Sequence, residues 1–376
     1  MRKEEGFLKR LSTNFKSVDV FFIQLTLSLI ITGLIFAFSS STFLSYKSTG
    51  NFWSLGIKQV IATCIGFILM IILSKTDYKL LIKHTFTIAF IILIIMLITQ
   101  FSPLGKASGG SKRWIDILGF QFQPAETTKL AVLLLVSKLL IQYKWNNLKP
   151  VCSHLLLVVA LIFLVLKQPD LGSASILFFV TMELLFVFGW PLWLLSLSIP
   201  AALIAVISKI KGTQYQMERI TYWLKPELDP QGKGFNIIQA KYAFGLGNIF
   251  GTGLGNSIQK NGALPVAHSD FIFAVVGEEV GFLGVTAILF LFITWILRGL
   301  FLVNKIENNY GKILASGIIF TITTQMLINI SVAVGLMPVT GVTLPFFSCG
   351  GTSIIVTLAM IGILFNILST IDDVDV

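Results

Sequence analysis

The chain has 376 residues, of which 55% are hydrophobic and only 12% are charged, and its mean hydropathy is +0.85. Soluble domains carry about a quarter charged residues, so this composition excludes an ordinary globular protein and predicts a polytopic membrane protein. The net charge of +10 does not indicate nucleic-acid binding, because the Lys and Arg residues are scattered over the segments between apolar runs, where they read as topology signals.

Ten apolar runs follow one another along the chain. Basic residues precede the first run, which is too long for a signal peptide, so the positive-inside rule places the N-terminus in the cytoplasm. An even number of spans then returns the C-terminus to the same side. The sequence therefore predicts an all-α polytopic membrane protein, a single domain over 1–376, with runs at 18–38, 57–73, 84–99, 124–143, 153–166, 172–189, 191–207, 271–302, 314–336 and 351–368.

Cysteine and histidine show no pattern that would form a disulfide framework or a metal site. The three cysteines lie in or beside apolar runs without paired spacing, and the three histidines are equally dispersed. Neither group predicts a zinc cluster. The residues are Cys64, Cys152, Cys349, His84, His154 and His268.

Two connections on the predicted outer side carry the residues of most chemical interest. The first, 101–123, is a Gly/Ser-rich loop holding Lys112, Arg113 and Trp114. Arg113 suits a phosphate ligand, because its planar guanidinium offers paired donors. The second, 209–269, is a long extracytoplasmic loop between the seventh and eighth runs, and loops of this length largely escape the positive-inside rule.

Glu126 and Lys129 lie inside the fourth run, three residues apart and therefore on one helical face. One interpretation is a snorkelling pair near the helix end that neutralises itself. The other is a charged pair in an outward-facing cavity. Their position close to Arg113 and Trp114 favours the second interpretation.

The stretch 245–256 is the richest in glycine but fits neither the dinucleotide fingerprint nor the P-loop. It is either a flexible loop with tight turns or a backbone that must lie close to a ligand.

Asp170 and Asp270 each stand directly before or at the start of an apolar run. Asp170 follows Pro169, and helix capping explains it at least as well as chemistry does. Asp270 faces the same alternative, but it has His268 and Ser269 beside it. A carboxylate at a membrane–water boundary can act as general base on a sugar hydroxyl.

Glu278 and Glu279 lie inside the eighth run, where carboxylates are costly and therefore in need of partners. Neighbouring residues point about a hundred degrees apart on a helix, so we expect only one of the two to face a cavity.

Several stretches together resemble one protein family. They include Gly109-Gly110-Ser111-Lys112-Arg113-Trp114, Gln168-Pro169-Asp170-Leu171-Gly172, Ala267-His268-Ser269-Asp270-Phe271 and Gly350-Gly351-Thr352-Ser353, and they occur in family order from about residue 20 to 370. The chain resembles the SEDS family, the RodA and FtsW group of bacterial cell-wall polymerases. Three positions depart from the family pattern: Val266, Ser269 and Cys349.

The resemblance implies a reaction. SEDS proteins polymerise lipid II into glycan strands: the 4-hydroxyl of an incoming sugar attacks an anomeric carbon, and undecaprenyl pyrophosphate leaves. The family's essential aspartate falls on Asp270. The resemblance is also compatible with a divalent cation, Mg²⁺ or Mn²⁺, bound with the pyrophosphate, although the sequence shows no set of side chains that would enclose one. Predicted substrate contacts are Lys112, Arg113, Trp114, Glu126, Lys129, His268, Ser269 and Glu278.

The same resemblance implies partners and a location. It predicts a class B penicillin-binding transpeptidase and other division proteins as partners, lipid II and undecaprenyl-pyrophosphate-linked glycan as substrates, and the bacterial cytoplasmic membrane at the septum. The stretches 251–260 and 276–279 look like the division member of the family, whereas the short termini look like the elongation member. A lipid II flippase and a scaffold for the transpeptidase are the alternative functions.

Overall fold

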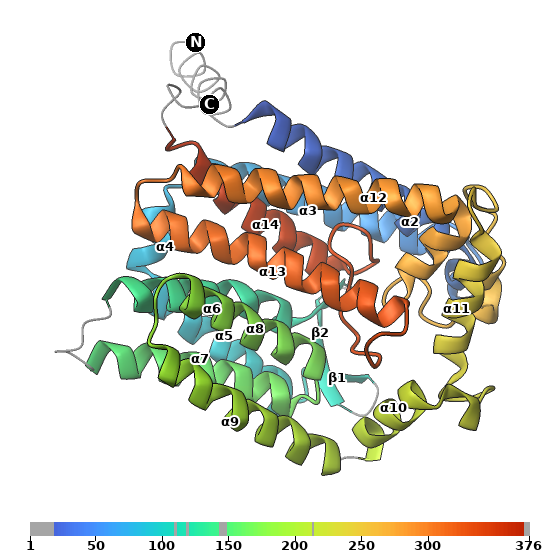
Figure 1. Cartoon of the computed structure of the whole chain (residues 1–376), viewed down its shortest axis with the longest axis horizontal. Coiled ribbons are helices and arrows are strands. Elements are labelled where there is room, and N and C mark those ends of the chain that lie inside the picture. The colour runs from blue at the N-terminus through green and yellow to red at the C-terminus, as the bar shows by residue number, and fades with distance from the viewer. Residues whose placement is uncertain (1–18, 109–110, 118–119, 143–148, 213, 372–376) are drawn as a thin grey trace.

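The long apolar runs fold as helices because a lipid environment leaves backbone N–H and C=O groups no partner except one another. The computed structural model describes residues 19–108, 111–117, 120–142, 149–212 and 214–371, and within these ranges the long helices lie side by side in one bundle (Figure 1). They are α2 Val20–Thr49, α3 Ser54–Lys75, α5 Thr85–Phe101, α6 Pro124–Gln142, α7 Lys149–Lys167, α8 Leu171–Val187, α9 Leu192–Lys211, α12 Ile272–Asn304, α13 Asn309–Ala333 and α14 Gly351–Leu368.

Each of the ten predicted runs coincides with one of these helices, which confirms the helical membrane fold. By length and hydropathy alone, five helices within the described ranges can cross a membrane (α2, α3, α12, α13 and α14), and a bent pair formed by α9 and α10 could add a sixth. Helices α5, α7 and α8 are apolar but shorter. The count of ten spans therefore stays a prediction.

Helix α2 continues well beyond residue 38, where its predicted run ends. The extension is rich in serine and threonine, which hydropathy scores as polar. These hydroxyls bond back to the helix itself: Ser40 Oγ donates to Ala37 O at 3.3 Å and Thr49 Oγ1 donates to Ser45 O at 2.9 Å. Polar side chains that satisfy themselves in this way do not end a helix.

The segment 101–123, predicted as a loop, contains a small antiparallel sheet. Its strands are β1 Gly105–Ser108, β2 Ser111–Ile117 and β3 Phe120–Phe122, in the order β1-β2-β3. Lys106 pairs with Trp114 across β1 and β2. The fold is therefore helical throughout its spans but not entirely α.

The segment 209–269, predicted as a long loop, is also folded. It contains α10 Gln214–Leu224, the short 3₁₀ helix η1 Pro226–Leu228, α11 Phe235–Gly247 and a π-helical turn, η2 Gln259–Ala263. Trp223 Nε1 of α10 donates to Gly335 O at 2.9 Å, so this segment packs against the connection between α13 and α14. One further short helix, α4 Tyr78–Lys83, joins α3 to α5.

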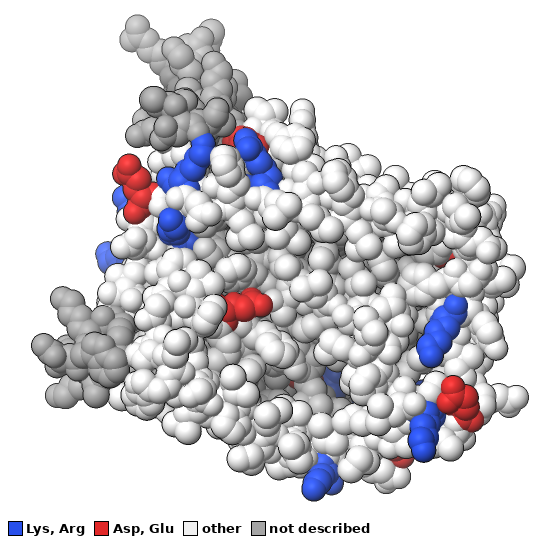
Figure 2. Space-filling model, viewed as in Figure 1, with Lys and Arg blue, Asp and Glu red and all other residues white. Residues whose placement is uncertain are grey.

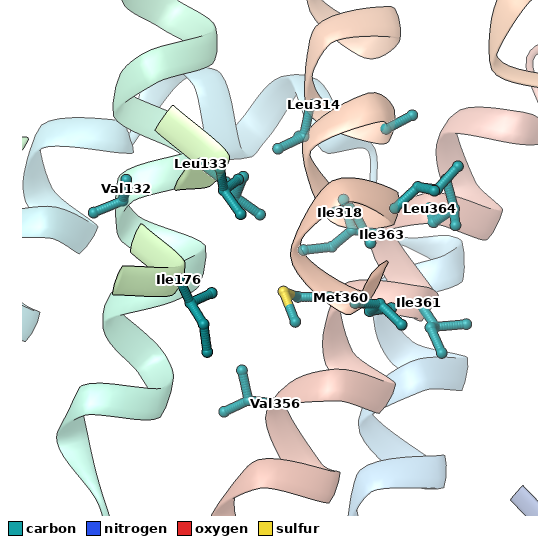
Figure 3. Packing of buried hydrophobic residues seen from close by; sticks show 14 of the residues in the cluster. Val132, Leu133, Ile176, Leu314, Ile318, Val356, Met360, Ile361, Ile363 and Leu364 are labelled. Carbon is teal, nitrogen blue, oxygen red and sulfur yellow. The ribbon is translucent and has the colours of Figure 1, made fainter. Parts of the chain in front are cut away.

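The centre of the bundle is formed by α13 and α14, whereas α12 lies at its edge. In their most apolar stretches, 78% of α13 and 83% of α14 residues are buried, against 22% for α12. Figure 3 shows side chains of α6, α8, α13 and α14 directed into one apolar core. They include Val132, Leu133, Ile176, Leu314, Ile318, Val356 and Met360.

Charged side chains gather toward the ends of the bundle, and the face between them is largely uncharged (Figure 2). Helix α2 begins and α14 ends at the same end (Figure 1). There Asp19, which caps α2, forms an ion pair with Arg298 of α12. This arrangement agrees with an even number of crossings.

Glycine allows α14 to lie very close to α3. A Cβ built on Gly362 would stand 2.4 Å from Met70 O, a backbone atom that cannot turn aside. We predict that Gly362→Ala lowers the free energy of unfolding by about 1–3 kcal/mol, because it overpacks this contact. A lower thermal midpoint of the detergent-solubilised protein would show it.

Gly245→Ala is the matched control, because no atom lies within 4 Å of its added Cβ on the exposed face of α11. Alanine in a helix interior is favoured over glycine by up to about 1 kcal/mol, so this variant should melt at the wild-type temperature or above. Equal midpoints for the two variants would contradict the close-packing argument.

Candidate functional site

Asp270 lies just before α12, where the chain passes from the outer connection into the bundle. Its side chain is partly exposed, whereas the residues that follow it, from Phe271 through Val276, are buried. Burial raises the pKa of Asp270 to about 6; the hydroxyl of Ser269 and the charge of Arg219 lower it, and the charge of Asp170 raises it further. A carboxylate with such a pKa is ionised at neutral pH and still basic enough to accept a proton.

The backbone around Asp270 is held by α13 and by the segment that connects it to α14. Three consecutive carbonyls accept hydrogen bonds: His268 O from Cys349 N at 2.8 Å, Ser269 O from Ser348 Oγ at 2.7 Å, and Asp270 O from Asn329 Nδ2 at 3.1 Å. The carboxylate itself takes no part in these contacts. Residues 268–270 are therefore anchored through their backbone carbonyls, and the carboxylate of Asp270 remains available to accept a proton.

The turn that carries Asp170 lies on the neighbouring side of the site. Asp170 caps α8: its Oδ1 accepts from Ser173 N at 3.0 Å and its Oδ2 from Ser173 Oγ at 2.9 Å, which confirms the capping interpretation. Arg113 of β2 donates to Gln168 O and Pro169 O, both at 2.8 Å. These bonds occupy two guanidinium donors in holding the turn, whereas the sequence predicted a phosphate contact for Arg113.

The Glu126–Lys129 pair is buried inside the bundle. Lys129 Nζ lies 2.9 Å from Glu126 Oε2, and the two side chains are 2% and 8% exposed. The two residues do neutralise each other, but the ammonium does not reach solvent, so the pair neither snorkels nor faces an outward-facing cavity in this structure. Lys129 also donates to Gln325 Oε1 at 2.8 Å, and Gln325 Nε2 donates to Thr343 O at 3.0 Å. The pair is thus connected to the segment that holds Asp270.

Glu278 and Glu279 are both buried and both bind the outer connection. Glu278 accepts from Ser257 Oγ at 2.5 Å and from Ile258 N at 2.7 Å. Glu279 forms a buried ion pair with Lys260 at 2.7 Å. These contacts do not show either carboxylate facing a cavity, so that expectation stays a prediction; the contacts of Glu278 are with the protein's own loop rather than at the Asp270 segment.

The glycine-rich stretch lies against a break in α12. Gly281 has a φ of +66°, and there the helix is interrupted. The loop backbone pairs with the freed groups: Thr252 N donates to Glu278 O at 2.9 Å and Gly253 N to Glu279 O at 3.0 Å. A Cβ on Gly251 would stand 2.2 Å from Glu279 O, so the neighbour that requires glycine here is α12, whereas the second interpretation of the sequence was a nearby ligand.

The remaining predicted substrate contacts lie in two places, on β2 and beside Asp270. Lys112 Nζ donates to Ser102 O at 3.0 Å, and Trp114 is half-buried on the same strand. His268 and Ser269 lie next to Asp270 and are half-buried, and burial lowers the pKa of His268, which leaves its imidazole neutral at pH 7.

Sequence reasoning missed Arg219, Gln325 and Asn329. Arg219 belongs to α10, in a segment predicted to be an unstructured connection. Gln325 and Asn329 lie four residues apart in an apolar run, and this spacing on one helical face was the available signal.

The described residues contain no group of three or more His, Cys, Asp or Glu side chains that could hold a metal ion. Asp170 is already engaged by Ser173. Within the described ranges, side chains alone therefore form no all-protein cage for Mg²⁺ or Mn²⁺. What the arrangement offers is a single acid, fixed at the boundary of the bundle, that can accept a proton from a bound hydroxyl.

Comparison with known proteins was made on sequence and on structure. The model of the FtsW/RodA/SpoVE family, described as cell cycle protein, matches residues 19–372. A protein of Trichlorobacter lovleyi named probable peptidoglycan glycosyltransferase FtsW is 33% identical over 93% of this chain and 92% of its own. Stage V sporulation protein E of Bacillus subtilis is 35% identical over 95% and 98%.

Two solved structures are also similar. One, described as "Structural coordination of polymerization and crosslinking by a peptidoglycan synthase complex", matches with a TM-score of 0.76 and 28% identity over 93% of this chain and 97% of that chain. The rod shape determining protein RodA of Thermus thermophilus matches with a TM-score of 0.69 and 25% identity over 93% and 96%. The match of the family model over nearly the whole chain shows that this protein belongs to the FtsW/RodA/SpoVE family.

Proposed function

We propose that this protein is a peptidoglycan glycosyltransferase that polymerises lipid II at the outer face of the bacterial cytoplasmic membrane. The observation that carries the proposal is the partly exposed carboxylate of Asp270, whose backbone is anchored and whose pKa is about 6. The names of the relatives and the synthase complex support the same activity.

In this reaction Asp270 acts as general base. The 4-hydroxyl of the acceptor sugar gives its proton to the carboxylate, and the hydroxyl oxygen forms a bond to the anomeric carbon of the lipid-linked donor. The bond from that carbon to the pyrophosphate oxygen breaks, and undecaprenyl pyrophosphate leaves with the electron pair. We place no resident metal in this scheme; Mg²⁺ or Mn²⁺ would enter with the pyrophosphate of the substrate.

We assign the protein to division rather than elongation, in a septal complex with a class B penicillin-binding transpeptidase and other division proteins, and with both termini in the cytoplasm. The relatives named FtsW support the division role. The synthase complex supports a transpeptidase partner.

Asp270→Asn should lower glycan polymerisation by the purified protein with its transpeptidase about 10²–10⁴-fold, because the amide cannot accept the proton. Polymer length and yield from lipid II would be measured on gels. Glu183→Gln is the matched control, because Glu183 is another half-buried carboxylate, and it accepts from the hydroxyl of Thr324 at 3.2 and 3.3 Å, away from the Asp270 segment.

Polymerisation that survives in Asp270→Asn would remove the general-base assignment. A wild-type protein that moves lipid II across liposomes without forming polymer would favour the transporter instead.

Activity should depend on pH through the same group. Since the carboxylate must be ionised to accept a proton, kcat/KM should fall about tenfold per pH unit below about 6 and be flat above it. Because the charge of Arg219 lowers the pKa of Asp270, Arg219→Gln should shift the acid limb to higher pH. An acid limb near pH 4, the ordinary range of a carboxyl group, would contradict a general base with a raised pKa.

Depletion of the protein in its own cells distinguishes the two biological roles. A septal enzyme predicts filamentous cells, since elongation continues while division stops. Rounded cells of normal length would assign the protein to elongation. Microscopy of a depletion strain, complemented by wild type and by Glu183→Gln as the active control, provides the measurement.

A further inference from the structure

Asn329 makes a contact that no part of the proposed reaction requires directly. It lies on α13, is 1% exposed, and its Nδ2 donates to Asp270 O at 3.1 Å and to Val342 O at 2.7 Å. One carboxamide therefore joins the backbone of the acid to the backbone of the connection between α13 and α14. Both acceptors are carbonyls, which require donors, so the orientation of the amide follows from its neighbours.

A second carboxamide, one turn earlier on α13, holds the adjacent residue of the same connection. Gln325 Nε2 donates to Thr343 O and to Thr343 Oγ1, both at 3.0 Å, while its Oε1 accepts from Lys129. Residues 342 and 343 are therefore anchored on α13 by two amides four positions apart. The buried Glu126–Lys129 pair is in turn hydrogen-bonded to one of them.

These contacts place Asn329 at the junction between two groups of polar residues. On one side lie Glu126, Lys129 and Gln325 within the bundle, and on the other lies Asp270 at its boundary. Of the three contacts described above to the carbonyls of 268–270, the one from Asn329 comes from a helix of the bundle, whereas the other two come from the connection. A helix in the core of the bundle is the more rigid support.

We propose that Asn329 is a positioning residue for Asp270: it fixes the backbone of the acid against α13 and thereby sets the distance between the carboxylate and the attacking hydroxyl. This inference rests on the proposed function. Asn329 does not touch the reacting atoms, so its effect must appear in the chemical step rather than in the binding of lipid II.

The test compares Asn329→Leu and Asn329→Asp with wild type in the polymerisation assay with the transpeptidase partner. Leucine removes the donors at similar size, and aspartate puts an acceptor against two carbonyls. Because a displacement of about 1 Å can cost about a hundredfold, we expect kcat to fall about 10- to 100-fold, with KM for lipid II within about twofold of wild type. Asn329→Gln, which keeps the donor on a longer side chain, should recover part of the rate.

Asn366→Leu is the matched control for lost stability. Asn366 of α14 also bridges two backbone groups, accepting from Tyr78 N at 2.9 Å and donating to Ser74 O at 3.0 Å, but at the far end of α14 from the Asp270 segment. Its thermal midpoint should fall together with that of Asn329→Leu while its kcat stays at the wild-type value.

A double variant separates positioning from general destabilisation. Residues that act as a unit are not additive, so Asn329→Leu should slow Asp270→Asn no further. A wild-type kcat in Asn329→Leu, a loss confined to KM, or an equal loss of kcat in Asn366→Leu would each overturn the positioning role. If wild type forms no polymer at all, the proposed function itself fails; if Asp270→Asn is inactive and Asn329→Leu is not, only this inference fails.

Discussion

The structure depends on one constraint, which is that polar groups inside an apolar bundle must find partners within the protein. Lys129 meets Glu126 and Gln325, and Lys260 meets Glu279. Lys129 joins α6 to Gln325 of α13, and Lys260 joins the outer connection to Glu279 of α12, so satisfying these charges also fixes the packing. An ion pair of this kind contributes little net stability against an apolar alternative, but losing one partner is costly because the other is left buried and unpaired. The buried charges therefore specify the arrangement of the helices more than they strengthen it.

The sequence predicted the spans well because hydropathy reports directly on what lipid requires. It failed in the connections, where folding depends on pairing between distant residues. The strand β2, which contains Lys112, Arg113 and Trp114, was predicted as part of a loop because the surrounding segment 101–123 is rich in glycine and serine. The end of helix α2 was predicted too early, because the serines beyond residue 38 lower the hydropathy without ending the helix. Hydropathy reports how favourably a residue transfers from water to lipid. It does not report the hydrogen bonds that a side chain makes with its own backbone.

In the site as well, the sequence indicated individual residues but not their partners from distant parts of the chain. Asp270 could be found from its place at the boundary of an apolar run, and the family resemblance gave it a role. Its anchor, Asn329, is 59 residues further along the chain, in a helix whose amides look like interruptions of an apolar pattern. Glu278 was expected at the substrate because a buried carboxylate suggests chemistry, yet its partner is Ser257, which directly follows the glycine-rich stretch. Such partners are tertiary contacts, and spacing within one chain segment cannot indicate them.

These contacts together explain how an acid at a loop–helix junction can be held still. Upstream of Asp270, residues 257–260 are tied to Glu278 and Glu279, which lie downstream on α12, so the intervening segment is closed on itself. The break at Gly281 lets the glycine-rich loop pair with α12 just beyond this closure. The connection between α13 and α14 supports the carbonyls of 268 and 269 from another side, and Asn329 of α13 supports that of Asp270. With the backbone fixed on both sides, the freedom left at Asp270 is that of its own side chain. A polymerase that must meet each new sugar hydroxyl in the same geometry requires a base held in this way, since reorganisation at each cycle would add to the barrier.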